Sequence, residues 1–357
     1  MPPLPIKNWT LGKMIGQGSF GRVYMALNLD NGEFMAVKQV LLPVSASSTP
    51  PSRPNPHQSK QTEALQHELE MLRELSHVNI VRYLGFEIQQ NSSLNVFLQY
   101  VSGGSIASLL RKTGKLDLIV VRYFTFQILC GLAYLHSKLI IHRDIKSGNV
   151  LVDADGICKI TDFGTSKKNY FNVKLLAYKM AYQRMTRMSM QGSIPWMAPE
   201  VVVKGKGYSA KVDVWSCGCL VLEMLTGVPP WHNATGSVVY LLGNGNAPPI
   251  PSDLPEIAQA FLKLCFIVDP EQRPTAAALI EHEFCRLTEA ETDAFDFQRW
   301  VLEAEERHAA EVGVDEDEED SSETDSDDSE ESDESEEDDE GGAETEASSV
   351  PAVSDVE

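Results

Sequence analysis

The sequence has no cysteines at the spacing of a zinc site or of a disulfide framework. It therefore lacks two common means of stabilising a small fold. Its six cysteines are scattered over 357 residues, with no C-x-x-C pair and no histidines at zinc-ligand spacing. Such spacing predicts neither a structural zinc site nor a disulfide framework. We therefore expect reduced cysteines in the core, at Cys130, Cys158, Cys217, Cys219, Cys265 and Cys285.

The sequence also lacks segments that direct a chain to a membrane. Residues 1–5 have neither the charged region nor the apolar region of a signal peptide. No apolar run approaches the roughly 20 residues that span a bilayer. We therefore expect no membrane insertion and a cytoplasmic location.

Basic residues are few and dispersed, with 30 Lys and Arg against 52 Asp and Glu and a formal net charge of −22. Binding to nucleic acid needs a concentrated basic surface, so we expect no nucleic-acid partner. The acidic residues are concentrated instead, because 19 of the 26 residues from Asp315 to Glu340 are Asp or Glu. Like charges at this density oppose compaction, which predicts a disordered acidic tail over 315–357.

With 43% hydrophobic residues, the rest of the chain can bury a large core. Alternating apolar residues predict three strands within 9–40 and two more around 80–86 and 94–99. Between them, a stretch rich in Pro and Ser over 43–60 predicts a flexible insertion. The leucines that follow recur at helical spacing and predict one helix, at Leu65, Leu69, Leu72 and Leu75.

After Gly103 and Gly104 the period of the apolar residues becomes helical. The predicted helices cover 106–111, 120–136, 212–226, 257–266 and 275–282. A further helix over 295–312 is predicted within an extension at 286–314. The predicted fold is therefore α+β, with a small antiparallel sheet lobe that carries one helix and a larger, mainly helical lobe.

A glycine-rich segment at Gly16, Gly18 and Gly21 lies between the first two predicted strands. Without a Cβ, backbone N–H groups there can approach phosphates, although an ordinary hairpin turn has the same glycines. A dinucleotide-binding fold needs a helix directly after such glycines. Here a strand follows, which argues against a dehydrogenase.

Lys38 lies in the third predicted strand, where the neighbouring apolar residues face inward. It is either an ordinary surface charge or a lysine that binds phosphate. The second interpretation needs a carboxylate partner on the following helix. Glu68 fits best, and Glu63 and Glu70 are its competitors. Glu70 falls about 200° round the helix from Glu68 and should face away.

The most specific pattern is the run from Ile141 to Asn149, followed by Asp162, Phe163 and Gly164. Phosphoryl transfer needs a carboxylate for the attacking hydroxyl, ligands for Mg²⁺, and a cation near the transferred group. Asp144 supplies the carboxylate, Asn149 and Asp162 the ligands, and Lys146 the cation.

Together these motifs resemble a complete eukaryotic protein kinase domain over 9–285, with an N-terminal lobe at 9–101 and a C-terminal lobe at 102–285. The resemblance implies the two-lobed kinase fold with ATP and Mg²⁺ as cofactors. It makes Asp144 the catalytic base and pairs Lys38 with Glu68. The residues it implies around the nucleotide are Ile15, Gly16, Gly18, Ser19, Gly21, Val23, Ala36, Lys38, Leu98, Gln99, Val101 and Leu151.

The resemblance also implies contacts within the C-terminal lobe. Glu200 pairs with Arg273, and Asp213 is the buried aspartate that braces the catalytic loop. Ser193 contacts Asp144 and Lys146. Three positions depart from the family pattern, namely Val78, Pro195 and an unusually long, apolar segment at 169–187, which is a regulatory helix or the product of an imperfect gene model.

The position of Lys146, two residues after Asp144, resembles that of the lysine in the serine/threonine branch of the family. The motifs at 84–86, 100–106 and 188–193 resemble those of the fungal type of MAP kinase kinase kinase. The implied substrate is a MAP kinase kinase, with an upstream activating kinase or scaffold as a further partner. Ser189, or alternatively Thr186, would receive an activating phosphate that meets Arg143. The alternatives are a pseudokinase or scaffold, whose usual sign is loss of Lys38, Asp144, Asn149 or Asp162, and a structural or chaperone-like protein that acts through its acidic tail.

Overall fold

A computed structural model of the chain describes residues 6–18, 21–41, 74–89, 93–162, 167–168, 193–202, 209–288, 290–291 and 295–319. The chain divides into two compact units, residues 1–311 and 312–357. The predicted helix at Leu65, Leu69 and Leu72, the insertion at 43–60, the segment at 169–187, and the tail beyond 319 lie outside the described residues.

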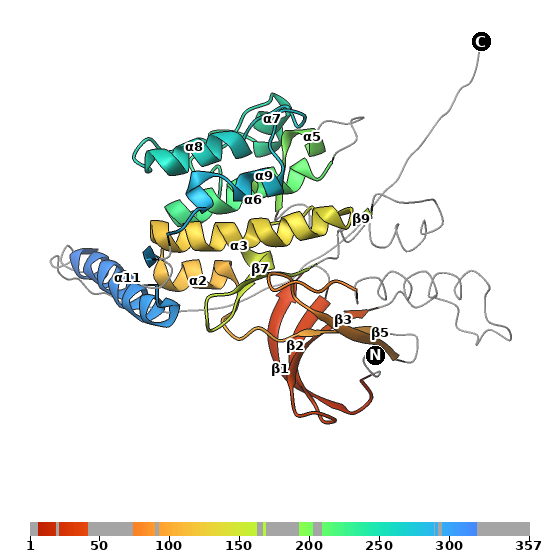
Figure 1. Cartoon of the computed structure of the whole chain (residues 1–357). Coiled ribbons are helices and arrows are strands. Elements are labelled where there is room, and N and C mark those ends of the chain that lie inside the picture. Colours follow the sequence, from red (N-terminus) through yellow and green to blue (C-terminus); the bar gives the residue numbers. More distant parts are fainter. Residues whose placement is uncertain are drawn as a thin grey trace, which may run out of the picture. The chain divides into compact units, whose positions relative to one another are not determined.

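Five of the described strands form one antiparallel sheet in the order β1-β2-β3-β5-β4 (Figure 1). They are β1 (Trp9–Gly18), β2 (Gly21–Asn28), β3 (Phe34–Leu41), β4 (Tyr83–Gln89) and β5 (Ser93–Gln99). Ala26, Met35, Val37 and Phe97 pack together as a small core of this sheet. The sheet lobe predicted from the alternating apolar residues is confirmed.

The fourth strand begins later than the sequence predicts, at Tyr83 instead of residue 80. Ile80 forms a parallel bridge to Ile160 instead, and two backbone hydrogen bonds flank it: Val81 N–H donates to Ile160 O and Ile160 N–H to Asn79 O. The apolar residues at 80 and 81 are therefore buried against the helical lobe. Periodicity does not distinguish the two kinds of pairing, because both bury apolar side chains.

The helical lobe follows the sheet and contains the main core. Its helices are α2 (Ile106–Thr113), α3 (Leu118–Ser137), α5 (Pro199–Val202), α6 (Lys211–Thr226), α7 (Val238–Gly243), α8 (Glu256–Cys265) and α9 (Ala276–Ile280). Its 3₁₀ turns are η1 (Ser147–Asn149), η3 (Ile194–Trp196) and η4 (Glu283–Cys285). Its strand pairs are β6 (Ile140–Ile141) with β9 (Lys167–Lys168) and β7 (Val150–Val152) with β8 (Cys158–Ile160).

Five helices lie within two residues of their predicted bounds. The short elements were not predicted, because they have too few residues for a period.

Helix α3 corrects the expectation that no apolar run approaches membrane-spanning length. It has 20 residues, and an 18-residue window of it has a mean hydropathy of 1.7, so by length and composition it is able to cross a bilayer. Among the helices that the structure describes, α3 alone meets this test. Phe124, Ile128 and Leu132 on it are fully buried, and α6 and α9 pack against it. A helix buried on several sides is apolar all round, and this accounts for its composition.

A last helix, α11 (Phe297–Glu319), follows the predicted domain and lies beside α2 (Figure 1). Trp300 and Ala304 are 8% and 3% exposed and belong to the main core. Trp300 Nε1 donates to Asp117 Oδ2 at 2.7 Å, and Arg307 Nη2 donates to the same oxygen at 2.9 Å. Residues 315–319, assigned from sequence to the disordered tail, are helical. Glutamate has good helix propensity, and a helix already formed extends readily.

Trp300→Phe should lower the free energy of unfolding by at least about 1 kcal/mol, because the hydrogen bond to Asp117 is lost and the smaller phenyl ring fills less of the buried site. Urea unfolding followed by circular dichroism measures the change. Leu302→Ala is the matched control on the same helix, since Leu302 is 64% exposed. Equal stability of Trp300→Phe and the unmodified chain would contradict the anchoring of α11 through Asp117.

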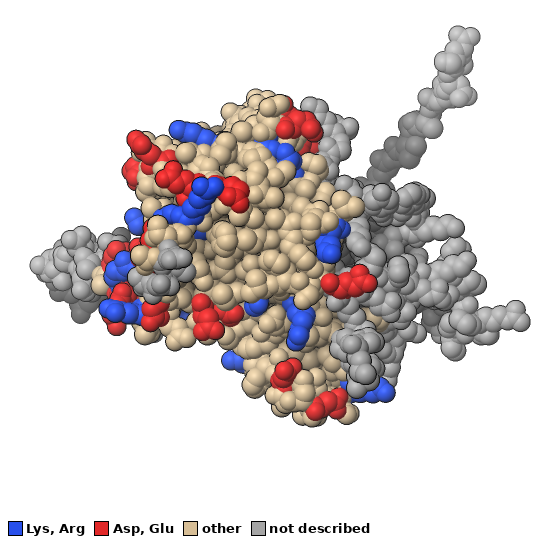
Figure 2. Space-filling view, viewed as in Figure 1, with Lys and Arg blue, Asp and Glu red and all other residues tan. Residues whose placement is uncertain are grey.

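Acidic and basic side chains are interspersed on the face of the molecule shown in Figure 2. The middle of this view, around α3 and α6, is largely uncharged. The described residues on this face therefore present no field of a single sign.

Candidate functional site

The register of the sheet gathers one set of candidate residues on one face. Val23 lies opposite Gly16 on β1 and opposite Lys38 on β3, and Ala36 lies opposite Leu98 on β5. Opposed residues of antiparallel strands share a face, and so do residues two apart on one strand, such as Ala36 and Lys38. These five positions therefore lie on the same side of the sheet.

The turn between β1 and β2 requires glycine at one position. Gly21 has a φ of 134°, and a Cβ there would lie 2.1 Å from the carbonyl oxygen of Gln39. Gly18 pairs with Gly21 at the end of the hairpin, and Ile15 is 42% exposed. Ser19 lies outside the described residues. The hairpin therefore holds its backbone close to β3.

The chain leaves the sheet through Gln99 and Val101, and Val101 is 8% exposed. A bridge between Ser105 and Leu151 then joins this connection to β7. Val152 N–H also donates to Gly104 O at 2.8 Å. Leu151 is thus placed beside the segment that links the lobes, as the candidate nucleotide site requires.

Asp144 lies at the centre of a hydrogen-bonded cluster in the helical lobe and is 7% exposed. Asn149 Nδ2 donates to Asp144 Oδ2 at 2.8 Å and to its carbonyl oxygen at 2.7 Å. Lys146 Nζ lies 3.1 Å from Asp144 Oδ2 and donates to Ser193 Oγ at 2.7 Å. The predicted contact of Ser193 with Lys146 is therefore confirmed, whereas its predicted contact with Asp144 stays a prediction. The Asp144 carboxylate is held by two donors, Asn149 and Lys146.

Asp213 on α6 holds the backbone just before Asp144. Its carboxylate is fully buried and accepts hydrogen bonds from His142 N at 2.9 Å, Arg143 N at 2.7 Å and His136 Nε2 at 2.8 Å. Burial alone raises the pKa of Asp213, but these bonds and the nearby histidines lower that pKa overall. Arg143 has a φ of 72°, which is unfavourable for a side chain of its size. The buried carboxylate therefore stabilises a strained loop, and the bracing role that the kinase resemblance implies for Asp213 is confirmed.

Lys38 pairs with Asp162 across the two lobes. Lys38 Nζ donates to Asp162 Oδ1 at 2.6 Å, and the side chains are 17% and 23% exposed. Asp162 has a φ of 66°, so this carboxylate is presented by a left-handed residue. Glu68, the predicted partner of Lys38, and Phe163 lie outside the described residues, so the predicted pair between Lys38 and Glu68 stays a prediction.

The predicted pair between Glu200 and Arg273 is confirmed. Arg273 donates from Nη1 to Glu200 Oε1 at 2.7 Å and from Nη2 to Oε2 at 3.1 Å. The two residues are 1% and 6% exposed. The guanidinium also donates to the carbonyl oxygens of Ile267 and Lys211 and lies 5.0 Å from the Trp215 ring. This ion pair ties the segment before α6 to the segment after α8.

Among the positions that depart from the family pattern, Pro195 lies near the start of η3, two residues after Ser193. A proline is tolerated there because the first N–H groups of a helical turn have no partner within it. Val78 is 59% exposed and so has no role in the core. Ser189 and Thr186 lie outside the described residues.

Sequence reasoning missed two residues near this site, His136 and Glu223. His136 donates to Asp213, and Glu223 is buried on α6. The spacing of Asp213 and Glu223, ten positions apart on one helix, places both on one face and is the signal that was available.

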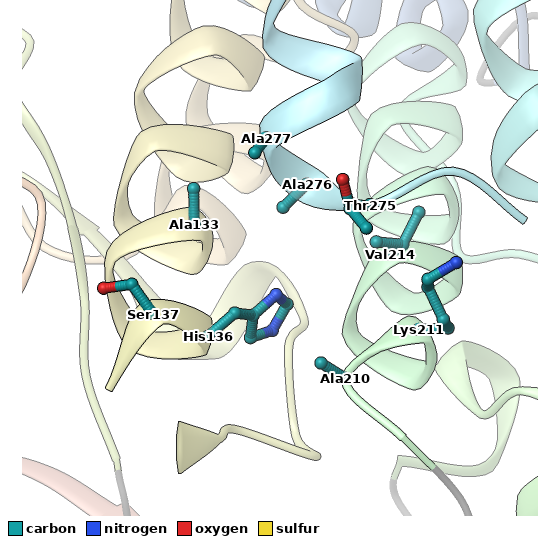
Figure 3. Close-up of a pocket in the computed structure, with 9 residues that line it drawn as sticks. All are labelled: Ala133, His136, Ser137, Ala210, Lys211, Val214, Thr275, Ala276 and Ala277. Carbon is teal, nitrogen blue, oxygen red and sulfur yellow. The ribbon is translucent and has the colours of Figure 1, made fainter. Parts of the chain in front are cut away.

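A pocket of about 290 Å³ opens between α3, α6 and α9 (Figure 3). Small and apolar side chains form most of its wall, together with His136, whose ring points into the space among them. The lining residues are Ala133, His136, Ser137, Ala210, Lys211, Val214, Thr275, Ala276 and Ala277. None of the predicted catalytic or nucleotide-binding residues is among them, so this pocket is separate from the cluster at Asp144.

Comparison with known proteins matches the model of the protein kinase domain to residues 9–285. The serine/threonine-protein kinase BCK1/SLK1/SSP31 of Saccharomyces cerevisiae is 48% identical over 287 residues, which are 79% of this chain and 18% of that protein. The mitogen-activated protein kinase kinase kinase MCK1 of Pyricularia oryzae is 47% identical over 78% of this chain and 18% of its own length. The MAP kinase kinase kinase mkh1 of Schizosaccharomyces pombe is 45% identical over 79% of this chain and 25% of its own length. The matched region thus spans about a fifth to a quarter of these relatives.

Proposed function

This chain belongs to the protein kinase domain family, and from that premise we propose that it transfers the γ-phosphoryl group of ATP to a serine or threonine of a MAP kinase kinase. The cluster of Asp144, Lys146, Asn149 and Ser193 carries this proposal. Lys146, two residues after Asp144, is typical of kinases that act on serine and threonine. The names of the relatives support the place in a MAP kinase cascade.

The residues present fit a magnesium-bound nucleotide. Mg²⁺ prefers oxygen ligands and is usually held by one or two protein groups together with substrate phosphates. Asn149 directs its amide nitrogen at Asp144, which leaves its amide oxygen for a metal, and Asp162 supplies a carboxylate. No group of three His, Cys, Asp or Glu that could hold an ion occurs in the described part of the chain. When bound, the nucleotide supplies the phosphoryl group and the metal offsets its charge.

The chain's own residues then orient and deprotonate the acceptor. Asp144 accepts a hydrogen bond from the substrate hydroxyl and takes its proton as the oxygen attacks. Lys146, held between Asp144 and Ser193, places a positive charge beside the transferred group. Lys38, paired with Asp162, carries the second cation of the site.

Purified chain should phosphorylate at least one member of a panel of kinase-dead MAP kinase kinases supplied with radiolabelled ATP. The inactive panel members exclude background from their own activity, and omission of the chain gives the blank. Binding of ATP without transfer to any substrate would favour a pseudokinase or scaffold, although Lys38, Asp144, Asn149 and Asp162 are all present.

We also propose that a phosphate on Ser189, or alternatively on Thr186, orders the activation segment by pairing with Arg143. A phosphate brings about −1.5 to −2 charges and strong acceptor oxygens for a guanidinium. Ser189→Ala should lower activity at least about tenfold, and Arg143→Ala should make activity independent of Ser189. Mass spectrometry of the active protein decides between the two sites, and full activity with neither residue phosphorylated would contradict the proposal.

A further inference from the structure

The pocket between α3, α6 and α9 has room for a small molecule (Figure 3). Its lining includes Val214 and Ala276, which are fully buried, and Ala277, which is exposed, so it runs inward from the surface. Four of its nine lining residues are alanines, whose short side chains leave the space open. Its 290 Å³ is about twice the roughly 150 Å³ of an apolar cavity that binds benzene. The pocket therefore fits a molecule of two fused rings.

His136 is the side chain that gives this pocket a polar group for a ligand. Its ring points into the space, and its Nε2 lies 2.8 Å from Asp213 Oδ2 (Figure 3). Burial raises the pKa of Asp213, but the bond from His136 and the charges nearby hold that pKa below its usual value. The ionised carboxylate can only accept, so Nε2 carries the hydrogen, and in the neutral ring Nδ1 is an acceptor. Nδ1 makes no hydrogen bond to any residue that the structure describes.

The other polar groups of the lining are already used within the protein. Lys211 Nζ donates to the carbonyl oxygens of Pro270 and Arg273. The hydroxyl groups of Ser137 and Thr275 are hydrogen-bonded to backbone atoms of their own helices. An anionic ligand would therefore find no available cation in this lining and would meet the negative charge that is bonded to His136.

Water is a poor occupant of this pocket. A well-held buried water makes about three hydrogen bonds, whereas this lining offers mainly apolar surface and one available acceptor. Replacing poorly held water by an apolar group is favourable, and the burial of the apolar wall adds to the gain. The chemistry that fits best is an uncharged aromatic body with one N–H or O–H donor.

We propose that this pocket binds an uncharged aromatic molecule of two fused rings, which donates one hydrogen bond to His136 Nδ1. The lining includes none of the described residues assigned to phosphoryl transfer, so the inference goes beyond the proposed function and does not depend on it. A molecule bound there would contact a histidine whose carboxylate partner, Asp213, also accepts from the backbone of His142 and Arg143. Its binding site would thus adjoin the support of the catalytic loop.

The test uses the full chain without ATP, labelled with ¹³C at the alanine methyl groups, and three probes. Indole has an N–H donor on two fused rings, benzofuran has an oxygen in the place of that N–H, and indole-2-carboxylate adds a charge beside it. Indole should shift the methyl signals of the four lining alanines, Ala133, Ala210, Ala276 and Ala277. It should bind at least about fivefold more tightly than either of the other probes, because benzofuran lacks the hydrogen bond and the carboxylate is repelled.

Two substitutions fill the pocket from different helices. Ala277→Phe on α9 and Ala133→Leu on α3 should each weaken indole binding by at least about tenfold, because the added side chain takes the space of the ligand. Ala278→Phe is the matched control, since Ala278 is exposed next to Ala277 but does not line the pocket. It should bind indole as the unmodified chain does, and circular dichroism checks that all three variants fold.

Three results would overturn the proposal. They are indole binding that shifts none of the four alanine signals, benzofuran or indole-2-carboxylate binding as tightly as indole, and unchanged indole binding in both Ala277→Phe and Ala133→Leu. None of these measurements requires turnover. A chain that binds indole as expected but phosphorylates no substrate would refute the proposed function alone.

Discussion

Asp144→Asn should lower the kcat of phosphoryl transfer by at least about 100-fold while leaving the chain folded. Asparagine has nearly the same shape, but it cannot take the proton of the substrate hydroxyl. One oxygen remains to accept from Asn149 or Lys146, so the loop should keep its place. Initial rates at saturating ATP and protein substrate measure the loss, and circular dichroism checks the fold.

Asp155→Asn is the matched control for this change. Asp155 lies in the exposed turn between β7 and β8, where the same loss of charge should leave kcat unchanged. Lys38→Met should match Asp144→Asn in effect, because it removes the cation paired with Asp162. Either variant at more than a tenth of the unmodified rate would disprove the role assigned to that residue.

Glu200→Ala should lower the free energy of unfolding by about 3–5 kcal/mol, because it leaves the Arg273 guanidinium buried without its carboxylate. Arg273 is 1% exposed, so water cannot replace the two lost hydrogen bonds without local opening. The midpoint and slope of urea unfolding measure the change.

Glu281→Ala is the comparison for this prediction, because the pair between Glu281 and Arg286 has a similar distance of 3.1 Å but side chains that are 74% and 66% exposed. Exposed ion pairs contribute little, so the unfolding midpoint of this variant should stay close to that of the unmodified chain. If both substitutions shifted the midpoint equally, burial would not be what makes the pair at Glu200 important.

Sequence patterns predicted the local structure and the contacts made by specific motifs. The long helices were found because each has several turns of apolar residues facing the core. The contacts between Glu200 and Arg273 and between Lys146 and Ser193 followed from the kinase resemblance, and both are present. The bracing of the catalytic loop by Asp213 was predicted in the same way.

The errors arose where one pattern serves two environments. The apolar residues of α3 belong to a central core helix, yet its mean hydropathy is as high as that of a membrane-spanning helix. Counting consecutive apolar residues missed this, because a few polar residues interrupt the run. Ile80 looked like part of a strand, although it pairs with Ile160 of the other lobe. Glu223 was missed because its hydrogen-bond partners, Ser147 and Trp196, lie far from it in sequence.

The family match ends at residue 285, but the core does not. Phe297 lies 5.7 Å from Phe124 between ring centroids, Phe295 lies 5.3 Å from Tyr123, and Trp300 is buried beside them. A chain that ended at the family boundary would expose the aromatic surface that α11 covers. Contiguous apolar patches of this kind promote association between molecules. Such a shortened kinase should therefore aggregate at concentrations where the full chain stays dispersed. Residues 295–311 thus shield an aromatic surface of the catalytic domain from contact with other molecules.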